Sequence, residues 1–195
     1  MIPLIDLLAD VRACTRCELP LGPNPVLRAH EDAELLIIGQ APGTKVHETG
    51  IPWNDPSGNR LREWLQMDRD AFYDERRVAI IPMAFCYPGK GKSGDLPPPP
   101  ICSETWHEAL LARLPNIRTT LLLGKYAQDR YLDWDGPLDA KSNLTERVRH
   151  YQQWAPRYWV MPHPSPRNQL WLRRNPWFEA EVLPAFRAHL HSQHH

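Results

Sequence analysis

Four short apolar runs constrain the fold of this chain more than any other feature of its sequence. They occupy residues 35–38, 78–81, 119–124 and 158–162. Apolar runs of this length are typical of strands that are buried on both faces of a sheet. Segments with helical spacing of apolar residues separate the runs and follow the last one. The alternation predicts an α/β fold, a three-layer α/β/α sandwich around a four-stranded, mainly parallel sheet.

The expected helices follow from apolar residues that recur at intervals of three and four. They are residues 2–13, 59–65, 104–114, 126–132, 169–174 and 176–190. We expect Ser57 and Ser103 to cap the second and third of these helices. Pro184 should bend the last helix or tighten it locally. The histidines at positions 189, 191, 194 and 195 are expected to form a frayed, solvated tail.

Length and charge bound the functional class. A chain of 195 residues fits one domain, spanning 1–195. Lys+Arg and Asp+Glu are equal at 23 each, so no overall field points to a nucleic-acid partner. We find neither a run of 18 apolar residues nor a signal peptide. We therefore expect a cytoplasmic monomer without membrane contact.

Two loops directly after buried runs are the first candidates for a site. Residues 39–43, Gly-Gln-Ala-Pro-Gly, follow the first run, and residues 163–168, His-Pro-Ser-Pro-Arg-Asn, follow the last. Ligands of open α/β sheets bind at the carboxyl ends of the strands. The prolines stiffen the second loop, which offers an imidazole, a hydroxyl and a guanidinium to an anionic or planar ligand. An ordinary strand-to-helix turn with polar surface residues would fit the second loop equally well.

Four cysteines form the second candidate site. Cys14 and Cys17 make a Cys-x-x-Cys pair, and fifteen residues separate Cys86 from Cys102. Four thiolates suit tetrahedral zinc or an iron–sulfur cluster. The alternative is a redox pair together with two buried free cysteines.

The two loops and the cysteine spacing, taken in this order, resemble the uracil-DNA glycosylase superfamily. The cysteines resemble the iron–sulfur branches, families 4 and 5, in which four such thiolates hold a [4Fe-4S] cluster. The last loop is more similar to the single-strand-selective monofunctional branch. The resemblance implies a monofunctional DNA repair glycosylase that flips out uracil or a related deaminated base. Hydrolysis of the N-glycosidic bond would leave an abasic site.

The resemblance also implies roles for residues near the reacting base. His163 would donate a hydrogen bond to the base carbonyl that gains negative charge. Trp53 would stack on the flipped ring, although core packing is the simpler explanation for a tryptophan. Asp55 would position water or stabilise the sugar cation, although it could be an ordinary turn residue before a proline. Backbone amides around Gln40, from Gly39 to Ala41, would hold the pyrimidine carbonyl.

Other residues are implied to bind the substrate or the DNA around it. Arg167 matches a wedge residue that fills the gap left by the base, or it binds phosphate. The remaining candidates are Asn54 and Ser165 for the substrate, and Asn168, Arg173 and Arg174, the last two beside a helix start, for DNA.

The sequence departs from the family pattern at two places. In some branches the first loop carries an acid, either Asp directly after Gln or Glu in its place, whereas this chain has Gln40 and Ala41. Relatives also use an Asn shortly before the third cysteine to read the uracil edge, and residues 81–86 contain none. Backbone groups or Asn54 would have to substitute. The alternative function is therefore a catalytically weak or inactive nucleic-acid-binding member of the superfamily.

Overall fold

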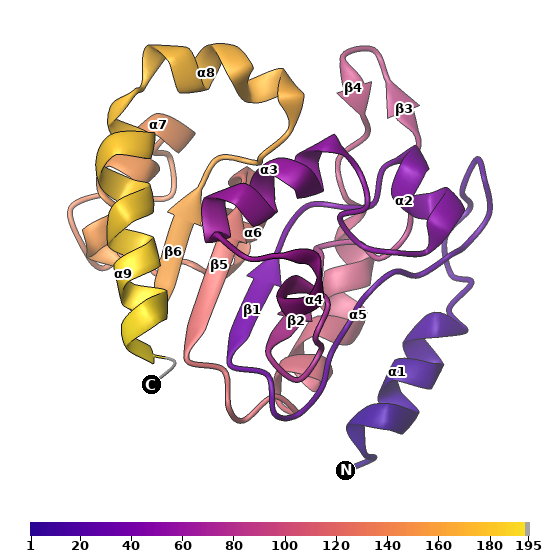
Figure 1. Ribbon diagram of the computed structural model, residues 1–195. Helices are drawn as coiled ribbons and strands as arrows, with labels where there is room; N and C mark the ends of the chain where they lie inside the picture. The colour runs from indigo at the N-terminus through magenta and orange to yellow at the C-terminus, as the bar shows by residue number, and fades with distance from the viewer. Residues whose placement is uncertain (194–195) are drawn as a thin grey trace.

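The computed structural model describes residues 1–193, which build a four-stranded parallel sheet covered by helices (Figure 1). The strands are β1 (Leu35–Ile38), β2 (Val78–Ile80), β5 (Thr119–Leu123) and β6 (Tyr158–Met161), in the spatial order β2-β1-β5-β6. All three pairings are parallel. The four expected strands and the fold class are confirmed.

Side chains of each strand alternate between two apolar layers because successive residues of a strand point to opposite faces. Leu36 and Ile38 pack into the layer below α1 (Leu4–Arg12), α5 (Pro100–Leu111) and α6 (Lys125–Tyr131). Leu35 and Ile37 pack into the opposite layer. That layer lies under α3 (Pro56–Leu65), α4 (Arg69–Phe72), α7 (Leu144–Arg149), α8 (Gln169–Arg174) and α9 (Leu183–Gln193). Helices therefore cover both faces of the sheet.

The strand order reverses between β1 and β5. The chain passes from β1 to β2 on one side of β1 and then crosses to β5 on the other side of β1. Such a switch point opens a crevice at the carboxyl edge of a parallel sheet. Figure 1 shows this edge at the top, with α8 and the hairpin of β3 (Lys90–Gly91) and β4 (Gly94–Asp95) above it. Helix α2 (Thr44–Thr49) and the 3₁₀ turn η2 (Pro166–Asn168) lie in the loops that leave this edge.

Two expected helix caps are wrong, and proline explains both. Helix α3 is capped by Asp55, whose side chain accepts a hydrogen bond from the Gly58 N–H at 2.8 Å, and not by Ser57. Helix α5 begins at Pro100, so Ser103 lies inside the helix. In both helices a proline occupies the first turn, where its missing N–H costs nothing.

Residues 189–193, which include His189 and His191, belong to helix α9 and are more ordered than expected. The last helix widens into a π-helical segment, η3 (Phe178–Val182), before Pro184, where bending or tightening was expected. Pro184 has no backbone N–H to donate to the preceding turn of the helix. The backbone adjusts by widening in that preceding turn, and not by tightening. His189 belongs to α9 and is hydrogen-bonded to the Thr119 hydroxyl at 2.8 Å, so it is not part of a frayed tail. His194 and His195 lie outside the described residues.

Within residues 1–193, no helix combines the length and the apolarity that crossing a membrane requires.

Candidate functional site

The two loops meet in one hollow at the carboxyl edge of the sheet, which we call the central cavity. Together with the open solvent at its mouth it comprises about 410 Å³ of empty space, and it is lined by Gln40, Trp53 and His163 together. The other candidates that line it are Gly39, Ala41 and Asp55. Three segments that are far apart in the sequence therefore contribute to one site.

The central cavity opens into a wider outer groove of about 1250 Å³, which shares Gln40, Asp55 and His163 with it. One wall of the groove is the last loop, with Ser165, Arg167 and Asn168. The opposite wall comes from the β3–β4 hairpin and the residue after it, and consists of Lys90, Gly94, Asp95 and Leu96. The position of this hairpin could not be predicted from the sequence.

His163 is held in one neutral tautomer. The Ser165 backbone N–H donates to its Nδ1 at 3.2 Å, so the proton of the neutral ring resides on Nε2. Burial lowers the pKa of His163 to about 4, because the surroundings disfavour a charged ring. At neutral pH the site therefore presents an uncharged imidazole whose Nε2–H can donate.

Gly124, at the end of β5, was missed in the sequence and allows two site residues to approach each other. Its φ of +84° is left-handed, and a Cβ at this position would lie 2.8 Å from Nε2 of Gln40 and 3.7 Å from Cβ of His163. Gly124 stands at the end of a buried run, as Gly39 does. A glycine in this position was the sequence signal that could have identified it as a site residue.

Trp53 and His163 form one wall of the central cavity. Their ring centroids are 5.4 Å apart with the planes tilted by 33°. The indole also lies against the backbone at Gly39, where a Cβ would approach its Cζ2 to 2.9 Å. A base cannot enter between the two rings, because contact distances of about 3.5 Å are needed on each side.

Asp55 places a carboxylate on the wall that the central cavity and the outer groove share. It lines the central cavity and the outer groove while its Oδ1 caps α3. The capping bond fixes the orientation of the carboxylate. The turn role and the candidate catalytic role of Asp55 are therefore compatible in one conformation.

The polar side chains of the last loop hold the loop itself. The Ser165 hydroxyl accepts from the Arg167 N–H at 3.2 Å, and the Asn168 amide donates to the His163 carbonyl at 2.7 Å. The Arg167 guanidinium donates to the Ser93 carbonyl of the hairpin. Arg167 thus joins the two walls of the outer groove.

Three candidates lie elsewhere. The Asn54 amide oxygen accepts from Arg69 at 3.2 Å, and Asn54 is not among the described residues that line the cavity. Arg173 and Arg174 occupy the last turn of α8, directly before the turn at Asn175 and Pro176 that leads into the next helix, and they are not among the lining residues of the groove.

The segment after β2 supports the first loop through its backbone. The Met83 N–H donates to the Gly39 carbonyl and the Ala84 N–H to the Gln40 carbonyl, both at 2.9 Å. Pro82 from the same segment lines the central cavity. This wall offers no side-chain amide, since residues 81–86 contain none.

Comparison with known families agrees with this geometry. The family model described as the uracil DNA glycosylase superfamily matches residues 28–187, about four fifths of the chain. The chain belongs to the uracil DNA glycosylase superfamily. Members of this superfamily are typically DNA glycosylases, which are hydrolases of DNA repair. Cys86 and Cys102 lie within the matched residues, whereas Cys14 and Cys17 precede them.

The four cysteines of this superfamily member line a second hollow, the cysteine cavity, which comprises about 480 Å³ of empty space when the open solvent at its mouth is included. Cys14 and Cys17 follow α1, Cys86 follows β2, and Cys102 lies in the first turn of α5. The Phe85 N–H donates to Sγ of Cys102 at 3.3 Å. Burial raises the pKa of Cys102 to about 12 despite this hydrogen bond, and it raises that of Cys86 as well. A bound metal would have to displace these protons.

The four thiols do not form a closely packed ligand set among the described residues. Within residues 1–193, no three Cys, His, Asp or Glu side chains are grouped closely enough to hold a single metal ion. A tetrahedral zinc ion with bonds of about 2.3 Å would need sulfurs about 3.8 Å apart.

Proposed function

We propose that this chain is a monofunctional DNA glycosylase that hydrolyses the N-glycosidic bond of uracil or a related deaminated base. The base would be flipped out of the DNA and the product would be an abasic site. The observation that carries the proposal is the convergence of Gln40, Trp53 and His163 on one cavity that opens into a polar groove.

His163 would stabilise the departing base. As the glycosidic bond breaks, negative charge develops on a carbonyl of the base. The Nε2–H of the neutral ring, fixed by the Ser165 N–H, would donate to that oxygen. One such preorganised donor typically contributes about 3 kcal/mol to the transition state.

Asp55 would act on the sugar side of the bond. The first loop has no carboxylate, and Asp55 brings one to the mouth of the cavity. A carboxylate in this place would orient the attacking water or stabilise the positive charge on the sugar. The cap bond from Gly58 would keep it in position throughout the reaction.

The outer groove would receive the DNA strand. Lys90 and Arg167 supply positive charge to its two walls, and Ser165 and Asn168 complete the wall around His163. Phosphate contacts of this kind fix the register of the strand and carry most of the affinity. We assign these contacts to groove residues in preference to Arg173 and Arg174.

We also propose that Cys14, Cys17, Cys86 and Cys102 hold a [4Fe-4S] cluster. When bound, the cluster would link the end of α1 to the segment after β2 and to α5. Zinc is the alternative. A brown protein with absorbance in the visible range, purified without exposure to air, would support the cluster, and a colourless zinc protein would contradict it.

The decisive test is release of free base from oligonucleotides. Single- and double-stranded substrates carrying uracil, hypoxanthine or xanthine are incubated with the wild type and with His163→Ala and Asp55→Asn. Release that both substitutions abolish or strongly reduce supports the proposal. Absence of release from every substrate would exclude it.

The second candidate function is binding without cleavage. It is favoured by the first loop, which lacks an acid, and by the wall of residues 81–86, which lacks an amide to read the base edge. A hydrophobic slot alone discriminates poorly between bases. Tight binding of uracil-containing DNA with no product would select this function over hydrolysis.

A further inference from the structure

A buried arginine lies beneath the aromatic wall of the central cavity. Arg62 of α3 is only 6 % exposed. Its guanidinium donates to the Trp53 carbonyl at 3.0 Å, to the Tyr73 hydroxyl at 3.1 Å and to the Asn59 amide oxygen at 2.8 Å. It also lies over the rings of Phe72 and Tyr73, at 5.3 and 5.6 Å from their centroids. All of these partners are neutral.

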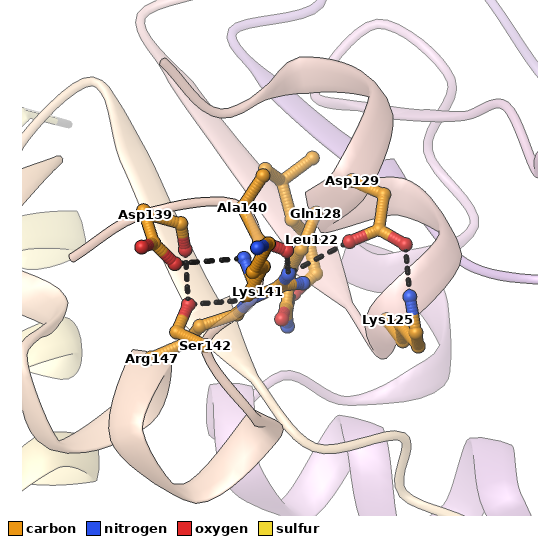
Figure 2. A network of polar contacts seen from close by, with 9 residues as sticks. All are labelled: Leu122, Lys125, Gln128, Asp129, Asp139, Ala140, Lys141, Ser142 and Arg147. Atoms are coloured by element: carbon orange, nitrogen blue, oxygen red, sulfur yellow. Dashed lines mark hydrogen bonds and ion pairs between the residues drawn. The ribbon is translucent and has the colours of Figure 1, made fainter. Parts of the chain in front are cut away.

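A second buried arginine, which has a carboxylate partner, contrasts with the neutral surroundings of Arg62. Arg147 of α7 is 1 % exposed and pairs with the Asp129 carboxylate at 2.8 Å, with further bonds to Ala140 and Ser142 (Figure 2). Buried charges are normally neutralised in this way. None of the ion pairs within the described part of the chain involves Arg62. A cation buried without a counter-ion is costly, so a role in placing its acceptors is a better explanation than stability.

One of the three acceptors, Trp53, has a backbone conformation that needs support. Its φ of +59° is left-handed, which is disfavoured for a bulky residue. The other described non-glycine residue with positive φ, Gln66, ends helix α3. Trp53 lies instead in a loop. Gly58 makes room for it, because a Cβ at position 58 would lie 1.7 Å from the Trp53 oxygen.

Tyr73 extends the support to the preceding residue. Its hydroxyl donates to the Pro52 carbonyl at 2.7 Å while it accepts from Arg62. The consecutive carbonyls of Pro52 and Trp53 are thereby bonded to Tyr73, which directly follows α4, and to Arg62 of α3. The same backbone places the indole against Gly39 and beside His163.

We infer that Arg62 is a positioning residue of the active site: it holds Trp53 in the left-handed conformation that places the indole beside His163. The inference rests on the proposed function, because it assigns the indole to the wall that receives the flipped base. Arg62 acts through Trp53 and does not touch the substrate.

A double-mutant cycle tests this role. Single-turnover release of uracil is measured for Arg62→Met, Trp53→Ala and the double variant. Arg62→Met should lower the maximal rate about tenfold or more and change the half-saturating enzyme concentration less than about threefold, since phosphate contacts dominate affinity. In the Trp53→Ala background the same substitution should change the rate by less than about threefold, because the two residues act as one unit.

Arg147→Met is the matched control. It also removes a buried guanidinium, so it should lower the midpoint of thermal unfolding at least as much as Arg62→Met does. The maximal rate of the folded Arg147→Met protein should stay within about twofold of the wild type. If Arg62→Met does not fold, Gly58→Ala displaces the Trp53 carbonyl from the opposite side and should lower the rate in the same manner.

Several outcomes would overturn the inference. They are an unchanged rate in Arg62→Met and in Gly58→Ala, an additive effect in the Trp53→Ala background, or an equal loss of rate in Arg147→Met. If the wild type releases no base, the proposed function fails by itself. A crystal structure of Arg62→Met, or of Gly58→Ala should that variant alone fold, then decides the inference: a displaced Trp53 supports it, and a retained positive φ with the indole still on Gly39 overturns it.

Discussion

At the scale of single residues, the neutral state of His163 makes a distinctive prediction. His163→Ala should lower the rate of base release by about 10²–10³, the usual cost of losing one oxyanion donor. Because the pKa of His163 lies near 4, the ratio of wild-type to variant rates should stay constant between pH 8 and about pH 5. Single-turnover rates across this range check the prediction. A ratio that changes with a midpoint near the ordinary histidine value of about 6.5 would contradict it.

Asp55 allows its two roles to be separated, because asparagine caps helices about as well as aspartate. Asp55→Asn should change the free energy of unfolding by less than about 0.5 kcal/mol and lower the rate of base release by about 10² or more. Asp68 is the matched control, since its side chain caps α4 by accepting from the Ala71 N–H at 2.8 Å. Asp68→Asn should leave both quantities unchanged. Full activity in Asp55→Asn would restrict Asp55 to capping.

The sequence allowed prediction of the site residues that lie directly after strands or in the loops that follow them. Gln40 and His163 fall at the carboxyl edge of the sheet, where chemistry is expected in an α/β fold. Arg62 and Tyr73 were missed because their roles depend on hydrogen bonds to carbonyls 9 and 21 residues away. No local pattern distinguishes such an arginine from a solvated one on a helix face.

At the scale of elements, the strands were predictable because their apolar runs are buried on both faces. The starts of α3 and α5 were not predicted correctly, because each helix begins at a proline that precedes the serine expected to cap it. The hairpin β3–β4 has two residues in each strand, too few for a periodic signal. Its place beside the last loop depends on the contact between Arg167 and Ser93.

Helix α5 carries a buried histidine that should make stability depend on pH. Nε2 of His107 is hydrogen-bonded to the Pro82 carbonyl at 2.8 Å and Nδ1 to the Tyr131 hydroxyl at 2.5 Å. A carbonyl only accepts, so Nε2 donates and Nδ1 accepts from Tyr131. Burial lowers the pKa of His107 to about 4, although the bond to Pro82 opposes the shift.

The sign of the effect follows from proton binding. The unfolded chain protonates this histidine near pH 6.5 and the folded chain only near pH 4, so stability falls as the pH is lowered through this window. The loss should approach about 3 kcal/mol at pH 4. Urea unfolding is measured at pH 7, 5.5 and 4.5 for the wild type and His107→Gln. The difference between their free energies of unfolding should become smaller as the pH falls. The exposed His150→Gln serves as control, and a cost independent of pH would contradict the assignment.

At the scale of the whole molecule, one backbone segment connects the two hollows. Residues 82–86 run from the central cavity, which Pro82 lines, to the cysteine cavity, which Phe85 and Cys86 line. Along the way, the Ala84 N–H bonds the Gln40 carbonyl and the Phe85 N–H bonds Sγ of Cys102. We therefore expect any group that orders the cysteines to order the segment that supports the first loop, residues 39–43, as well.

This connection predicts that loss of the proposed cluster lowers the rate of base release as well as stability. Cys86→Ser should abolish the visible absorbance and lower the rate of base release, because the segment that supports Gln40 loses its anchor. Thr105→Ser is the control, since Thr105 lines the same cavity without a thiol and should keep both the absorbance and the rate. Absorbance spectra and single-turnover rates are measured on the folded fraction of each variant. A colourless Cys86→Ser protein with the wild-type rate would show that the cysteine site braces the fold independently of the catalytic loop.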